Sequence, residues 1–301
     1  MKSGVKAGLL IGAFITEEIY RYIFCRKGSP VFNRLLDKKG HEEGYYAFRD
    51  SAAQRLRQTP QQRFYITSRR GNRLSGCYIP CGGGNRRIAF IVHGYRSEHA
   101  ETAGMFLDYY RSRGFDVFAP DNTAAGESGG HLIGFDVYES QDCLDWIDFL
   151  REKIGDDIEI VLHGFSMGGA TVLKMSDKCP ENVKFIVSDS GYKDADCIFM
   201  DRLGLFGKPF NILNRFIAGY SMSETSVCPA LERSNKPILF VHGQDDKTVP
   251  FMQGTELYEM YGGDKDCLFP ENTRHIESMY TSAAEYAGKL DRFIAEYISR
   301  S

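Results

Sequence analysis

The sequence predicts an α/β fold in which a mostly parallel β-sheet carries helices on both faces. Three observations predict it. From about residue 60 onward, short apolar runs alternate with longer segments of helical periodicity, as in successive βαβ units. Some runs, such as residues 88–92, are continuously apolar, which is typical of strands buried on both faces of a parallel sheet. The composition, 43% hydrophobic and 26% charged over 301 residues, supports a core of the size that this fold needs.

The N-terminal segment is predicted to form an amphipathic helix. Residues 7–15 are apolar, but a polar stretch at residues 16–18 follows with no small-residue cleavage site, unlike a secretion signal. About nine apolar residues are too few to span a bilayer, which takes about 20. Apolar side chains recur at helical spacing at Ile11, Ile15, Ile19 and Tyr22, with Glu17, Glu18 and Arg21 opposite. Three alternatives stay open: the helix packs on the body, lies on a membrane surface, or is a degenerate anchor.

The α/β alternation begins with two strands, residues 63–67 and 74–79, which are predicted to pair around a turn at residues 70–72. The later strands are predicted at residues 88–92, 117–119, 158–162, 185–187, 238–241 and 267–269. The helices between and after them are predicted at residues 100–113, 137–153, 167–178, 252–261 and 280–298. No internal sequence repeat accompanies this alternation.

One stretch interrupts the alternation, because more than forty residues between Ser190 and Lys236 carry no strand signal. Its apolar side chains at helical spacing are Phe199, Leu203, Phe206, Phe210, Leu213 and Phe216. We interpret residues 191–235, approximately, as a helical cap insertion; a crossover helix with loops is the alternative. The predicted organisation is therefore a helical extension at residues 1–58 and one α/β domain at residues 59–301.

Charge and cysteine content exclude several classes of protein. The net charge of −3 gives no general electrostatic attraction to nucleic acid, whose binding proteins usually have a strongly basic face, so no nucleic-acid partner is expected. The 8 cysteines are scattered and form no C-x-x-C pair, which argues against a zinc site and against a disulfide framework. Reduced thiols are expected, and with them a cytoplasmic location.

A serine at a strand–helix turn is the candidate nucleophile. Residues 164–168 match G-x-S-x-G, but residues 126–130 match it too, so context has to separate them. Ser166 follows a buried strand through one tight turn and opens a helix, as the motif requires, whereas no helix opens after Ser128. The sequence predicts Ser166 as the nucleophile and Ser128 as a polar loop residue.

A serine hydroxyl needs an adjacent base, and His275 is the candidate. It lies in the loop between the last strand and the final helix, which can reach over the carboxyl end of the sheet. The other histidines are predicted to be structural at strand ends (His93, His163 and His242) or exposed in polar stretches (His41, His99 and His131).

Asp246, in the loop after strand 238–241, is the candidate for the acid that orients the base. Along the chain, the candidate nucleophile Ser166 comes first, the acid Asp246 second and the base His275 last. This is one of the chain orders known for the catalytic triads of hydrolases. Asp245 and Asp189 are the alternatives for the acid. The backbone N–H groups of Met167 and Tyr95 are the candidate oxyanion donors, since one follows the nucleophile and the other leaves an earlier strand.

Four motifs in this order resemble those of serine hydrolases of the α/β-hydrolase superfamily: HGY at 93–95, GFSMGG at 164–169, HGQDDKTVP at 242–250 and the late His275. The likeness is to bacterial esterase-like and peptidase-like members with a small cap, and it covers about residues 60–300. It implies an α/β-hydrolase fold with an eight-stranded sheet and no metal or organic cofactor. The loop at residues 121–128 departs from the D-x-R-G-x-G-x-S pattern of many relatives, so its pocket is expected to differ.

The expected function is hydrolysis of a carboxylic ester, or a related small-molecule acyl compound, through an acyl-enzyme. The phenylalanines of residues 199–216 suggest an apolar acyl pocket under the cap. A thioesterase, acyltransferase or peptidase with the same triad is an alternative. So, in a different class, is a non-catalytic binding or membrane-associated module. The N-terminal helix leaves peripheral membrane contact open, and the oligomeric state is not predicted.

Overall fold

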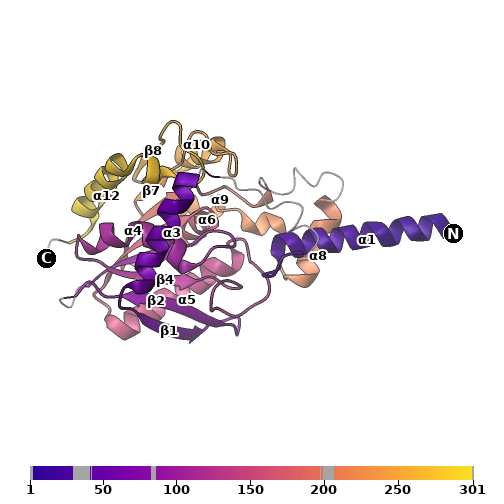
Figure 1. Ribbon diagram of the computed structural model, residues 1–301, viewed down its shortest axis with the longest axis horizontal. Coiled ribbons are helices and arrows are strands. Elements are labelled where there is room, and N and C mark those ends of the chain that lie inside the picture. Colours follow the sequence, from indigo (N-terminus) through magenta and orange to yellow (C-terminus); the bar gives the residue numbers. More distant parts are fainter. Residues whose placement is uncertain are drawn as a thin grey trace.

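The computed structural model describes residues 3–29, 41, 43–82, 86–196, 198 and 207–299. Their strands form one eight-stranded sheet in the order β1-β2-β4-β3-β5-β6-β7-β8, with helices on both faces (Figure 1). The strands are β1 (Gln62–Thr67), β2 (Arg73–Ile79), β3 (Arg87–Val92), β4 (Asp116–Asp121), β5 (Glu159–Phe165), β6 (Val183–Asp189), β7 (Ile238–Val241) and β8 (Lys265–Leu268). The predicted α/β class and the mostly parallel eight-stranded sheet are confirmed.

Within this sheet, β2 is the strand whose direction opposes that of the other seven. It pairs antiparallel with β1 and with β4, and every pair from β4 to β8 is parallel. The predicted turn joins β1 to β2, and Gly71 has a φ of 80° there, a conformation that glycine adopts without strain. The carboxyl ends of β3, β5, β6 and β7 therefore meet at one edge of the sheet, where the candidate site residues follow them.

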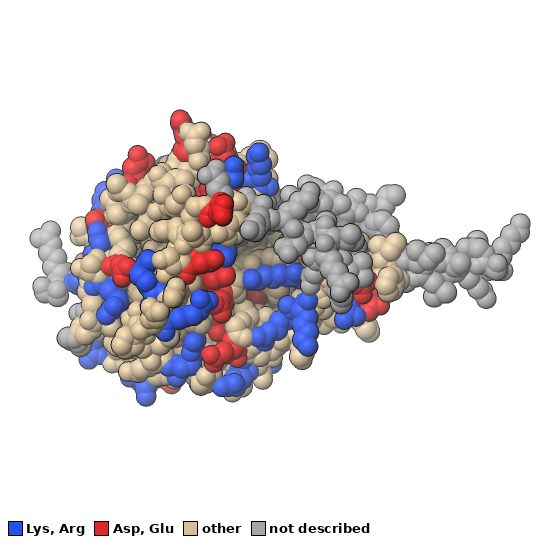
Figure 2. Space-filling model, viewed as in Figure 1, with Lys and Arg blue, Asp and Glu red and all other residues tan. Residues whose placement is uncertain are grey.

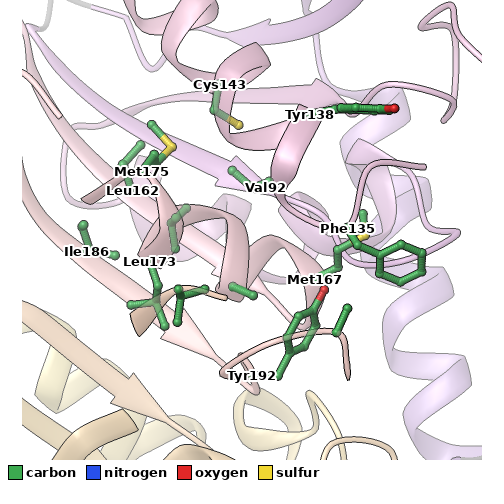
Figure 3. Packing of buried hydrophobic residues seen from close by; sticks show 14 of the residues in the cluster. Val92, Phe135, Tyr138, Cys143, Leu162, Met167, Leu173, Met175, Ile186 and Tyr192 are labelled. Carbon is green, nitrogen blue, oxygen red and sulfur yellow. The ribbon is translucent and has the colours of Figure 1, made fainter. Parts of the chain in front are cut away.

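The helices cover the sheet in two layers. One layer holds α3 (Glu43–Gln58), α4 (His99–Arg111) and α12 (Ala283–Tyr297), and the other holds α5 (Val137–Ile154), α6 (Met167–Lys174) and α10 (Phe251–Met260). Along β3, Ile88, Phe90 and Val92 join the α5–α6 core, while Ala89 and Ile91 join the core under α3 and α4. This period of two explains why the predicted strands read as continuously apolar. Figure 3 shows strand and helix side chains meeting in the first core.

Some predicted helices are shorter than expected. The helix predicted at residues 167–178 ends at Lys174, and a 3-10 turn follows at Ser176–Lys178. The one predicted at residues 280–298 is divided into α11 (Ser278–Thr281) and α12. The helix α3 was not predicted as a separate element. It packs closely on α4, because a Cβ at Gly104 would lie 2.5 Å from the Ala52 carbonyl oxygen.

The N-terminal helix α1 (Ser3–Phe24) projects from the body, and its carboxyl-terminal end packs on the body (Figure 1). Tyr20, Ile23 and Phe24 are buried there, so the packed face is offset from the one that the apolar spacing indicated. Glu18, expected on the polar face, is buried and accepts a hydrogen bond of 2.5 Å from the Ser29 hydroxyl. Among the described residues, no helix combines the length and the apolar character that crossing a membrane requires.

The predicted cap region contains α8 (Gly207–Ile217), a 3-10 turn at Met222–Thr225 and the short helix α9 (Cys228–Leu231). Three of its predicted apolar residues, Phe199, Leu203 and Phe206, lie outside the described residues. Phe210 is buried against α1, with ring-centroid distances of 5.6 Å to Tyr20 and 5.5 Å to Phe24. The bounds of the extension and of the cap insertion stay predictions.

Candidate active site

Ser166 lies at the turn between β5 and α6, with a φ of 54° and a ψ of −117°. This backbone conformation is strained for any residue other than glycine, so contacts with the surrounding chain have to stabilise it. The two motif glycines allow the tight packing: a Cβ at Gly164 would lie 2.0 Å from the Gly168 oxygen, and one at Gly168 would lie 2.2 Å from the Val92 oxygen. The turn therefore presents the serine hydroxyl at the carboxyl edge of the sheet.

The three predicted triad residues come together at this edge. Ser166 Oγ lies 2.8 Å from His275 Nε2, and His275 Nδ1 lies 2.6 Å from Asp246 Oδ2. A proton on Nδ1 donated to the carboxylate leaves Nε2 free to accept the serine proton, which is the tautomer that a general base needs. The histidine is 7% exposed and Asp246 is 5% exposed, so water has little access to this contact.

Asp246 is held as a carboxylate. Burial alone would raise its pKa, but the electrostatic interaction with His275 and hydrogen bonds from His242 and His275 outweigh burial, and the pKa lies well below the ordinary value. Its other oxygen, Oδ1, accepts backbone N–H bonds from Thr248 at 2.8 Å and from Val249 at 2.9 Å. The loop therefore fixes both the charge and the orientation of the group that faces His275.

A cleft of about 240 Å³ opens over Ser166 and His275. Gly94 and Tyr95, from the loop after β3, line it, and a Cβ at Gly94 would lie 3.2 Å from the Ser166 Cβ. Met167 is the first residue of α6, so its N–H has no carbonyl one turn earlier in the helix to bind. The two candidate oxyanion donors thus belong to two segments that border the nucleophile, the loop after β3 and the start of α6.

The two alternatives for the acid lie elsewhere. Asp245 is exposed. Asp189 is fully buried, and its carboxylate accepts hydrogen bonds from Ser190 Oγ at 2.9 Å and from Tyr286 Oη at 3.1 Å. Burial raises the pKa of Asp189 to about 6, although these two hydrogen bonds act in the opposite direction. Ser128, the serine of the second motif match, is buried, and its hydroxyl bonds the Asp121 carbonyl at 2.6 Å.

The other histidines divide almost as expected. His93, His163 and His242 are buried at strand ends, each with a hydrogen-bond partner. The prediction that His99 is exposed was wrong: it is 6% exposed, and its Nδ1 lies 2.7 Å from Asp121 Oδ1. The polar sequence around His99 gave no sign of this partner, which comes from the end of β4.

The prediction that His41 is exposed was also wrong, and sequence reasoning missed that this histidine lines the same cleft as the triad. It is half-buried, and its Nδ1 lies 2.8 Å from Oε1 of Glu277, a buried carboxylate two residues after His275. Burial lowers the pKa of His41, and the hydrogen bond with Glu277 opposes that shift. No periodic pattern surrounds His41 in the sequence, so nothing there pointed to the pair.

A second cavity of about 220 Å³ adjoins the site through Met167 and Arg96, and it is lined by residues 122–126 of the loop that departs from the family pattern. Neither Phe210 nor Phe216 lines either of these two cavities, and the acyl pocket expected under the cap stays a prediction. Among the described residues, no group of three or more His, Cys, Asp or Glu side chains is arranged to hold a metal ion.

Residues 83–196 match the family model described as serine aminopeptidase, S33. YqkD, an uncharacterised protein of Bacillus subtilis, is 25% identical over 95% of this chain and 96% of its own length. The human α/β hydrolase domain-containing protein 17C is 21% identical over 79% of this chain and 67% of its own length.

Solved structures resemble most of this chain. The Pyrococcus furiosus esterase Pf2001 matches with a TM-score of 0.64 and 20% identity, over 81% of this chain and 96% of its own. A puromycin-hydrolysing peptidase of Mycobacterium tuberculosis matches with a TM-score of 0.66 and 16% identity, over 81% of this chain and 40% of its own. At these identities the likeness establishes the fold.

Proposed function

We propose that this chain, which has the α/β-hydrolase fold, is a serine hydrolase that cleaves a carboxylic ester or a related acyl compound through an acyl-enzyme. The observation that carries the proposal is the hydrogen-bonded series Ser166 Oγ, His275 and Asp246, with distances of 2.8 and 2.6 Å. Esterases and peptidases among the structures of similar fold support a hydrolase.

In the proposed reaction, Ser166 Oγ attacks the substrate carbonyl carbon while His275 Nε2 takes the hydroxyl proton. The Tyr95 and Met167 N–H groups donate to the oxyanion of the tetrahedral intermediate. When the intermediate collapses, the leaving alcohol takes the proton from Nε2. A water molecule then attacks the acyl-enzyme, His275 accepts its proton, and the carboxylic acid leaves as Ser166 recovers its hydrogen.

Covalent labelling with a fluorophosphonate tests this proposal directly. The wild-type chain is expected to react at Ser166, and Ser166→Ala to show no labelling and a kcat lower by about 10⁴-fold or more. Ser128→Ala is the matched control, because it removes the serine of the other motif match; it is expected to keep its labelling. Equal labelling of wild type and Ser166→Ala would remove Ser166 from the mechanism. A wild-type chain that does not react with the probe would favour the non-catalytic binding module.

The leaving group separates the enzymatic alternatives. The family model of a serine aminopeptidase and the peptidase of similar fold favour an amide substrate as the second candidate. A panel of p-nitrophenyl esters of short and long acyl chains, acyl-CoA thioesters and aminoacyl anilides, compared by kcat/KM, distinguishes them. We expect the esters to be turned over best.

A further inference from the structure

Large apolar side chains are exposed where α1 and α8 project from the body. On α8, Ile212 is 70% exposed and Phe216 is 90% exposed, and on α1, Phe14 is 59% exposed. Single exposed apolar residues are common on protein surfaces, but a concentration of them marks an interaction site. We call the exposed residues Phe14, Ile15, Ile212, Phe216 and Ile217 the apolar tip.

The two helices of the apolar tip are held together on their inner faces. Phe210 of α8 packs against the rings of Tyr20 and Phe24 of α1, and the Tyr20 hydroxyl donates a hydrogen bond of 3.2 Å to Asn214 Oδ1. Figure 1 shows α8 beside α1 on the side where α1 leaves the body. Because packing already uses the inner face of α8, its exposed face at Ile212 and Phe216 is available to a partner.

Basic side chains lie at the base of the apolar tip. Among the described residues, a cavity of about 420 Å³ is lined by the basic side chains of Arg21, Arg26 and Lys27, by His131, and by Glu17, which lies 3.7 Å from Arg21. Arg21 follows Phe14 by seven residues and therefore shares its face of α1, about 10 Å along the helix. Figure 2 shows Lys and Arg side chains near the place where α1 meets the body. Apolar side chains beside a basic cavity match the acyl chains and phosphates of an anionic lipid.

We propose that the apolar tip and this basic cavity dock the protein on the surface of a membrane that contains anionic phospholipids. Phe14, Ile212 and Phe216 enter the acyl-chain boundary, and the basic side chains stay at the level of the phosphates. A lipid surface fits better than a protein groove, because the exposed side chains come from two projecting helices and lie beside excess positive charge.

Docking also sets where the cleft opens. The Tyr95 hydroxyl donates to the Tyr22 carbonyl at 3.2 Å and to the Ile23 carbonyl at 2.8 Å, and the Arg96 guanidinium donates to the Tyr22 carbonyl as well. The carboxyl end of α1 is thus tied to the loop that borders Ser166. A docked helix therefore holds the cleft close to the lipid, so that acyl substrates can reach it from the membrane. This consequence rests on the proposed function; the docking does not.

Co-sedimentation of the full chain with vesicles tests the docking. We expect binding to vesicles of phosphatidylglycerol and phosphatidylcholine in equal amounts, and weaker binding to phosphatidylcholine alone or at high salt. The double variant Ile212→Ser with Phe216→Ser is expected to bind the mixed vesicles at least about ten-fold more weakly, because it removes two of the inserted side chains. The matched control is Met252→Ser on α10, which is 60% exposed away from the tip and is expected to bind like wild type.

Hydrolysis of a water-soluble ester by the same variants separates the two proposals. Ile212 and Phe216 do not line the cleft, so the double variant should keep wild-type turnover while losing vesicle binding. Wild-type protein that stays in the supernatant with both kinds of vesicle overturns the docking, whether or not it hydrolyses esters. So does a double variant that sediments like wild type, or an apolar tip that drives self-association without lipid.

Discussion

Two residues beside the candidate triad adopt backbone conformations that residues other than glycine avoid. Ser190, after β6, has a φ of 54°, and Ile276, directly after His275, has a φ of 52°. For a β-branched residue such as isoleucine this is a marked outlier, and it persists only where neighbours enforce it. Here the Ile276 N–H donates to Ser190 Oγ at 3.1 Å, and that hydroxyl donates to the buried Asp189 carboxylate at 2.9 Å. Asp189 and Ser190 therefore hold the backbone next to His275, the proposed base.

Removing this hydroxyl should misplace His275 without touching the substrate. We expect Ser190→Ala to lower kcat by about ten-fold or more, because a small displacement of a reacting group is costly, while KM changes little. Steady-state kinetics on a p-nitrophenyl ester measure both constants. Ser176→Ala is the control, since this buried serine has no hydrogen-bond partner among the described residues. An unchanged kcat, or a rise in KM alone, would show that Ser190 does not position the base.

At the residue scale, local sequence patterns were sufficient to predict which candidate site residues lie just after the carboxyl ends of strands. Ser166, Asp246 and His275 each follow a strand, and parallel strands bring their carboxyl ends to one edge. Side chains that meet across unrelated segments were not predictable. His41 reaches Glu277 over 236 positions, and His99 reaches Asp121 across the layers, so no spacing records either pair.

At the scale of elements, the N-terminal helix and the loop after β3 behave as one unit. The ring of Tyr95 lies 5.4 Å from that of Phe135 between centroids, and its hydroxyl binds two carbonyls at the end of α1. The backbones of Cys25 and Leu132 form an isolated antiparallel β-bridge, and the Arg26 guanidinium donates a hydrogen bond of 2.6 Å to the Ser128 carbonyl. The sequence indicated a helix here but not where it packs, because the buried face depends on these long-range partners.

The variant Tyr95→Phe tests this connection, because it keeps the backbone N–H and removes only the hydroxyl. We expect a loss of about 1–2 kcal/mol of stability, since the hydrogen bonds to two carbonyls disappear. We also expect faster proteolysis within α1 and a several-fold lower kcat. Differential scanning fluorimetry and limited proteolysis measure the first two effects. Tyr65→Phe is the control: its hydroxyl bonds Glu127 at 2.8 Å on an exposed edge strand, and we expect little change.

At the scale of the whole molecule, the hydrophobic alternation was sufficient for the sheet and its two layers, since burial on both faces leaves a strong pattern. The same core also encloses acidic groups that no pattern marked. Asp136, Glu139 and Asp142 lie at the start of α5, all buried. Burial raises the pKa of Glu139 to about 7 and that of Asp142 to about 6. Folding therefore favours their protonated forms, and this makes the stability of the whole chain depend on pH.

The sign of that dependence follows from the unfolded chain, where an Asp has a pKa of about 3.9. Below this pH, Asp142 is protonated in both the folded and the unfolded state, so its ionisation does not change the free energy of unfolding. As the pH rises toward 6, the unfolded state releases its proton first, so the free energy of unfolding falls; above 6 the full penalty remains.

In Asp142→Asn the amide keeps an oxygen for the Thr123 hydroxyl, which donates to Asp142 Oδ2, and Oδ1 has no partner to lose among the described residues. We expect this variant to be more stable than wild type by about 3 kcal/mol at pH 8 and about equal to it at pH 4. Chemical denaturation at the two pH values measures this, with Asp148→Asn, an exposed carboxylate on the same helix, as the control. A gain of equal size at both pH values would mean that packing, and not the ionisation of Asp142, separates the variant from wild type.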